Sequence, residues 1–129
     1  METLMIEATK SSPKIEFNPI QHVLAIKGQS YPENAFKFYE PIFYWVDDYL
    51  QAVEDEVTIE VDFVLPYINT SSSKCIMMLL DKFEDAFQNG KKIKLNWYYD
   101  KENESELECA EEFQEDFSFP FHIVPRKGD

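Results

Sequence analysis

The chain is poor in glycine and cysteine, and both shortages exclude classes of protein. Only three glycines occur in 129 residues, so the sequence has no glycine-rich phosphate loop of a nucleotide-binding fold and no G-x-S-x-G serine elbow of a hydrolase. The two cysteines, Cys75 and Cys109, are far apart and form no C-x-x-C pair. This argues against a zinc site or a disulfide framework and favours a reducing cytoplasm.

Positive charge is also scarce. Twelve Lys and Arg residues stand against 25 Asp and Glu residues, which gives a net charge of −13, and such a charge repels nucleic-acid backbones and anionic membrane surfaces. No apolar run approaches the roughly 20 residues that span a bilayer, and residues 1–14 do not resemble a secretory signal. We therefore expect a soluble cytoplasmic protein without nucleic-acid binding or membrane insertion.

The composition is that of one folded domain. Apolar residues make up 44% of the chain and aromatic residues 16%, which is enough for a proper core at this length. No linker and no internal repeat divides the sequence, so residues 1–129 are predicted to form a single domain.

Alternation and helical periodicity predict the order β-β-α-β-α-β-α-β. Polar faces on the middle strands place the helices mainly on one side of a mixed sheet, and the strand–helix–strand units imply right-handed parallel crossovers. Glu60 and Asp62 on one strand and Lys92 and Lys94 on another predict parallel neighbours matched in charge. The predicted elements are strands at residues 14–18, 22–27, 57–65, 92–97 and 121–124 and helices at 34–53, 72–89 and 104–116.

Two helices carry more apolar surface than one buried stripe needs. The first helix has an apolar face of about half its circumference, so Phe36, Phe38 or Trp45 at its margins are candidates for exposure. Pro41 lies on its polar side, where we expect a tolerated kink. Met77 and Met78 point away from the inward stripe of the second helix, and flexible methionines suit adaptable interfaces.

The most informative segment is residues 66–74, which contain an unbroken run of hydroxyl residues from Thr70 to Ser73. The run lies between a strand and a helix, where open α/β sheets receive ligands and where helix N–H groups favour anions. One interpretation is an ordinary helix cap at Ser71 or Ser72; another is a phosphorylation site. A small enzyme that uses Asp62 or Glu33 as the acid is a third possibility, and an unmodified structural adaptor is a fourth.

Other polar groups favour structural roles. The acidic run over residues 100–116 is typical of a solvated helix face, although it is also compatible with a metal ion or a basic partner. It lacks the D-x-D-x-D-G order of a calcium loop. His22 and His122 have no ligand-like spacing, so we predict no metal site and no cofactor.

Several motifs in one order resemble the SiaC family of bacterial regulatory phosphoproteins, whose fold is similar to the STAS domains of anti-sigma-factor antagonists. Residues 67–74 resemble the phosphorylation loop of that family. Residues 28–34, 96–100 and 111–121 also match, so the resemblance covers nearly the whole chain.

The resemblance implies a non-catalytic partner switch that acts in signal transduction. By this resemblance, a serine/threonine kinase modifies Thr70 and a PP2C-type phosphatase restores it, with Ser71 as an alternative acceptor. The unmodified form engages and activates an effector such as a diguanylate cyclase, which links the switch to cyclic-di-GMP and biofilm regulation. Pro41 is a departure that bears on the docking face. The predicted partner-binding residues are Tyr31, Glu33, Asn34, Asn69, Ser71, Ser72, Lys74, Met77 and Met78.

Overall fold

The structure is a computed structural model that describes residues 1–127, and it contains a six-stranded sheet and three helices. The strands are β1 (Leu4–Ile6), β2 (Lys14–Asn18), β3 (Val23–Lys27), β4 (Thr58–Val64), β5 (Lys92–Asp100) and β6 (Phe121–Arg126), and the helices are α1 (Ala35–Ala52), α2 (Thr70–Gln88) and α3 (Glu104–Gln114). No helix within residues 1–127 is long and apolar enough to cross a membrane.

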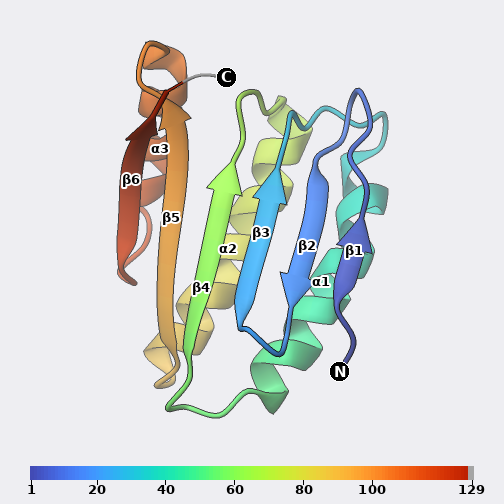
Figure 1. The fold of residues 1–129 in the computed structure, drawn as a ribbon, viewed down its shortest axis with the longest axis vertical. Helices are drawn as coiled ribbons and strands as arrows, with labels where there is room; N and C mark the ends of the chain where they lie inside the picture. The colour runs from blue at the N-terminus through green and yellow to red at the C-terminus, as the bar shows by residue number, and fades with distance from the viewer. Residues whose placement is uncertain (128–129) are drawn as a thin grey trace.

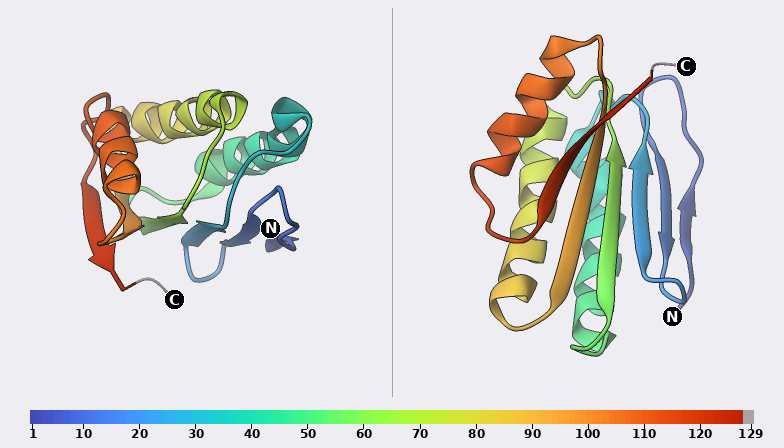
Figure 2. Two further views of the ribbon diagram at one scale, coloured as in Figure 1. Left: turned by 90° about the horizontal axis from the view of Figure 1, so that it is seen from above. Right: turned by 60° about the vertical axis from the view of Figure 1, so that its left-hand side comes forward.

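The strands lie in the sheet in the same order as in the chain (Figure 1). β1, β2 and β3 pair antiparallel, and β3, β4, β5 and β6 pair parallel. Successive right-handed crossovers that step in one direction place their helices on the same face of a sheet. Figure 2 shows α1, α2 and α3 on one side of the sheet, which confirms the predicted mixed α/β architecture.

The open face of the sheet carries the predicted charge pairing. Glu60 on β4 lies opposite Lys94 on β5, and their side chains approach to 3.6 Å. Asp62 lies opposite Asn96, whose amide donates a 3.0 Å hydrogen bond to it. The prediction that these two strands are parallel neighbours is therefore confirmed.

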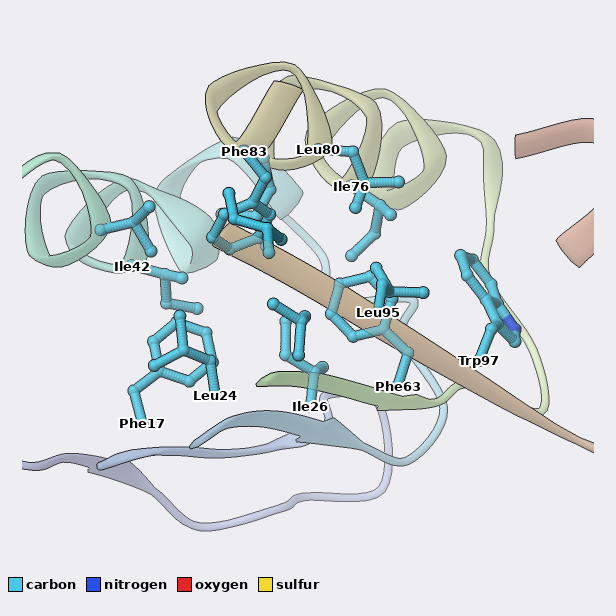
Figure 3. Packing of buried hydrophobic residues seen from close by; sticks show 14 of the residues in the cluster. Phe17, Leu24, Ile26, Ile42, Phe63, Ile76, Leu80, Phe83, Leu95 and Trp97 are labelled. Atoms are coloured by element: carbon cyan, nitrogen blue, oxygen red, sulfur yellow. The ribbon is translucent and has the colours of Figure 1, made fainter. Parts of the chain in front are cut away.

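The covered face of the sheet forms the core. Apolar side chains from the strands meet those from α1 and α2 (Figure 3). Trp97 on β5 is fully buried; it stacks on Phe113 of α3 at a ring-centroid distance of 5.1 Å and meets Phe63 of β4 edge-on at 5.4 Å. Full burial of a large apolar side chain stabilises the fold by about 1.5–3 kcal/mol. Through its contacts with Phe63 and Phe113, Trp97 joins the third helix to the sheet.

The N-terminal strand β1 is absent from the sequence prediction, because its three residues are too short to show a pattern. The residues just before β1 contact α1 at Trp45. The Trp45 indole donates a 2.9 Å hydrogen bond to the Glu2 carbonyl and packs on Phe17. Trp45 and Phe38 are only partly exposed, whereas Phe36 is exposed as predicted.

The ends of α3, β5 and β6 also differ from the prediction, and β5 continues past residue 97 to Asp100. α3 ends at Gln114. In its first half the acidic Glu106 is buried, whereas the apolar Leu107 is only half-buried. β6 continues through Pro125 to Arg126, because it is an edge strand whose outer side needs no N–H donor. Pro41 lies on the exposed side of α1, and the helix continues through it.

Candidate functional site

Two loops lie side by side beyond the carboxyl ends of β3 and β4. The Ser30 amide donates a 2.8 Å hydrogen bond to the Tyr67 carbonyl, and the Asn69 amide donates one of 3.0 Å to the Ser30 carbonyl. Ser30 and Ile68 thereby form a parallel bridge that extends the pairing of β3 with β4. This bridge fixes the start of α1 relative to the start of α2.

Gly28 allows the first of these loops to leave β3. Its φ angle is +131°, and its amide donates a 2.8 Å hydrogen bond to the Val64 carbonyl. A Cβ atom at this position would lie 3.2 Å from the Pro13 Cα atom. Glycine is required here both by the backbone conformation and by the close approach of a neighbouring segment.

Asn69 is the residue that caps α2. Its side-chain Oδ1 atom accepts a 2.8 Å hydrogen bond from the Ser72 amide, and its carbonyl accepts one from the Ser73 amide at 2.9 Å. The prediction of a cap at Ser71 or Ser72 is wrong, because asparagine binds the third helical amide well and the helix begins two residues earlier. Thr70 is thus the first residue of α2.

Thr70 and Ser71 are exposed, whereas Ser72 is fully buried. The first turn of α2 contains no acidic residue, although the first turn of α3 contains Glu104 and Glu106. In a chain of 25 acidic residues, the positive end of the α2 dipole therefore has no carboxylate from its own first turn, a setting that favours an added anion.

A buried chain of hydroxyl groups lies under the site. The Ser30 hydroxyl is 2.7 Å from the Tyr39 hydroxyl and donates a 2.8 Å hydrogen bond to the Ser72 hydroxyl. Burial raises the pKa of Tyr39 to about 12, so its proton is retained at neutral pH. The prediction that Ser72 binds a partner is corrected here, because its side chain faces the interior and links α2 to Ser30 and α1.

Two grooves flank the first turns of α2. The α1–α2 groove, with a volume of about 410 Å³, lies between the starts of those helices, and the α2–α3 groove, of about 260 Å³, lies on the other side. The α1–α2 groove is lined by Glu33, Asn34, Ala35, Phe36, Ser71, Lys74, Cys75 and Met78. The α2–α3 groove is lined by Ser73, Met77, Cys109, Glu112, Phe113 and Asp116.

The structure brings most of the predicted partner-binding residues to this end of the sheet. Five of them line the α1–α2 groove, and Met77 lines the α2–α3 groove. Tyr31 packs edge-on against Tyr67 at a ring-centroid distance of 5.9 Å. Tyr67 is 53% exposed and was not predicted as a site residue; an aromatic residue three positions before Thr70 was the available signal.

The residues of the alternative enzyme hypothesis do not form a catalytic group with Thr70. Asp62 lies on the open face of the sheet, where it accepts a hydrogen bond from Asn96, and Glu33 lines the α1–α2 groove beside Ser71. His22 contacts the Tyr49 hydroxyl at 2.6 Å, which is a structural role. Within residues 1–127, no group of three or more His, Cys, Asp and Glu side chains is arranged to hold a metal ion.

Comparison with known proteins identifies the family of the chain. Residues 6–126 match the family described as "SiaC family regulatory phosphoprotein". The chain belongs to this family. An uncharacterised protein of Pseudomonas aeruginosa strain UCBPP-PA14 is 42% identical over 123 residues, which cover 95% of this chain and 96% of that protein.

Solved structures of SiaC share the fold. Apo-SiaC from Pseudomonas aeruginosa is 40% identical, with a TM-score of 0.90 over 96% of this chain and 99% of that one. A second structure is that of the diguanylate cyclase SiaD in complex with its activator SiaC, in which the matching chain is 41% identical, with a TM-score of 0.90 over 95% of this chain and 99% of that one. The predicted family and fold are both confirmed.

Proposed function

We propose that this SiaC family protein is a non-catalytic regulator in which a phosphoryl group on Thr70 controls the docking of an effector protein. The observation that carries the proposal is the position of Thr70 as an exposed first residue of α2, between two grooves. The effector, the kinase and the phosphatase are all proposed to meet the molecule at this end of the sheet, in the cytoplasm.

Thr70 is favoured over its neighbours by its exposure. Ser72 is fully buried and Ser73 half-buried, so neither offers its hydroxyl to a kinase as readily. Ser71 is exposed and lines the α1–α2 groove, which makes it the alternative acceptor. The rigid cap at Asn69 holds both residues in the first turn of the helix.

A phosphoryl group at Thr70 changes the charge of the surface without unfolding it. It adds about −1.5 to −2 charges, and the N-terminus of α2 stabilises them. Lys74 lies one helical turn further on and is exposed, so the phosphoryl group also neutralises the nearest lysine of α2. At about 4 Å, repulsion of a partner carboxylate costs about 4 kcal/mol at an effective dielectric constant of 20, which weakens binding by nearly three orders of magnitude.

The proposed effector is a diguanylate cyclase. The related SiaC is the activator of the cyclase SiaD and forms a complex with it. The present protein matches nearly the full length of that SiaC. We propose that the unphosphorylated form binds and activates such a cyclase, and that a serine/threonine kinase and a PP2C-type phosphatase set the level of that form.

The modification itself is tested by intact-mass measurement after coexpression with candidate kinases. We expect one added phosphoryl group on the wild-type protein and none on Thr70→Ala. Ser71→Ala is the matched control, because it removes an exposed hydroxyl from the same turn and should leave the signal unchanged. A full signal on Thr70→Ala with a lost signal on Ser71→Ala would transfer the switch to Ser71.

The effect on docking is tested by calorimetric titration of the unphosphorylated protein with a diguanylate cyclase from the same genome. We expect Thr70→Ala to bind like the wild type and Thr70→Asp to bind at least about tenfold more weakly, which corresponds to 1.4 kcal/mol. Equal affinity of the two variants would contradict control by charge at this position.

A further inference from the structure

A third groove lies at the opposite end of the sheet from Thr70. It is formed at the amino ends of β4 and β5, beside the last turn of α2, and has a volume of about 530 Å³. We call it the lysine groove. Its lining residues are Thr58, Phe87, Lys91, Lys92, Ile93, Lys94, Pro120 and His122.

The lysine groove exists because β6 is shorter than β5. Phe121, the first residue of β6, pairs with Leu95, so residues 92–94 of β5 pair with β4 on one side and have no strand on the other. Pro120 precedes β6 and has no N–H group with which to extend the ladder. The side chains of Phe87, Ile93 and Pro120 supply apolar surface to the space that remains.

The charged residues that line the lysine groove are basic, whereas the molecule as a whole is acidic. Three lysines and one histidine line it and no acidic residue does, although the chain contains 25 acidic residues. Lys91 is held by Asp55 at 2.8 Å and by the Val53 carbonyl, and Lys94 pairs with Glu60 at 3.6 Å. Lys92 is exposed and forms no ion pair within residues 1–127.

The geometry points to a second docking site in the lysine groove, which takes a short acidic segment of a partner protein that inserts one large apolar side chain. The apolar side chain would cover Phe87 and Pro120, and a flanking carboxylate would pair with Lys92. A nucleic acid is a poor occupant because the net charge of −13 repels a long polyanion. A second copy is also a poor one, because two chains that each carry a net charge of −13 repel each other.

This site is independent of the switch. It lies at the end of α2, whereas Thr70 lies at its start, and the helix is 19 residues long. The proposal therefore does not rest on phosphorylation, and a partner held here would stay bound in both states of Thr70.

The test uses a fluorescein-labelled peptide, acetyl-Asp-Glu-Phe-Glu-Asp-amide, in a fluorescence anisotropy titration against the full chain. A matched peptide carries serine in place of phenylalanine. The protein variants are Lys92→Glu and Thr58→Glu, both at exposed groove positions, and Lys27→Glu is the control, since it reverses an exposed charge at the other end of the sheet. Circular dichroism verifies that each variant is folded.

We expect saturable binding of the phenylalanine peptide to the wild type, to Lys27→Glu and to Thr70→Asp, and binding at least about tenfold weaker with Lys92→Glu, Thr58→Glu or the serine peptide. Absence of saturable binding up to about 1 mM peptide would overturn the proposal. So would equal binding to Lys92→Glu and Lys27→Glu, or equal binding of the two peptides, because either result indicates attraction by charge alone. Loss of binding in Thr70→Asp would place the peptide at the switch and would also refute the proposal.

Discussion

The hydroxyl group of Ser30 links α1 to α2 beneath the two loops of the site, and its removal should loosen the starts of both helices. Ser30 is fully buried and contacts Tyr39 and Ser72 through its side chain. It also bridges to the α2 loop through its backbone. We therefore expect Ser30→Ala to destabilise the fold and to raise local opening at the start of α2.

The size of the stability loss follows from the hydroxyl groups that Ser30→Ala leaves without a partner. Ser30→Ala deprives the buried Tyr39 hydroxyl of its acceptor and the Ser72 hydroxyl of a donor, and each such loss costs about 1–3 kcal/mol. Both lost hydrogen bonds involve Ser30, and the side chains of Tyr39 and Ser72 can partly relax together. We therefore expect the free energy of unfolding to fall by about 2–4 kcal/mol. Tyr39→Phe removes only one of these hydrogen bonds and should cost about 1–2 kcal/mol. The double variant should cost less than the sum of the two.

The assay is urea denaturation followed by tryptophan fluorescence, with hydrogen exchange of the Asn69 amide as the local measurement. The Asn69 amide donates a hydrogen bond to the Ser30 carbonyl, so its exchange reports on the pairing of the two loops. Ser105→Ala is the control, since Ser105 is exposed and a surface change of this kind stays within about 0.5 kcal/mol. A loss of stability in Ser30→Ala no larger than in Ser105→Ala would refute the reasoning.

Three further predictions concern the same scaffold. Burial raises the pKa values of Tyr39 and Tyr49 to about 12. Above pH 10 the unfolded chain releases these protons first, so the free energy of unfolding should fall from pH 10 to pH 12, and phenylalanine at both positions should flatten that fall in urea titrations. Gly28→Ala should cost about 1–3 kcal/mol, because the positive φ angle is strained for alanine and its Cβ atom crowds Pro13; a thermal midpoint equal to that of the wild type would exclude this strain. Asn69→Ala should cost about 1 kcal/mol and Asn69→Asp much less, because aspartate still caps the helix, as denaturant midpoints would show.

Much of the fold was predictable because its signals are local. The alternation of Glu60 and Asp62 with apolar residues identified β4, and the cap at Asn34 located the start of α1. The start of α2 was placed two residues late, because a run of hydroxyl residues offers several caps that sequence spacing alone does not rank. Tertiary contacts decide between them, since burial of Ser72 against Ser30 leaves the capping role to Asn69.

The candidate site was predictable in composition but not in arrangement. The sequence motifs contained Glu33, Lys74 and Met78, and the structure places them in one groove. Met77 and Met78 are neighbours in sequence but line different grooves, because successive helical residues point about 100° apart. The position of Tyr67 at the site depends on the contact of its ring with that of Tyr31 on the other loop, and no local sequence pattern encodes this contact.

The identity of strand order and chain order has a consequence for synthesis of the protein on the ribosome. Each strand pairs with the one made just before it, so no strand has to wait for a partner from beyond the next strand in the chain. Assembly in which each new strand joins the strand made before it avoids the longest loop closures. It also shortens the lifetime of aggregation-prone folding intermediates. The first five strands and two helices precede α3 in the chain, so Thr70 and the loops around it can fold before the last helix and strand are translated.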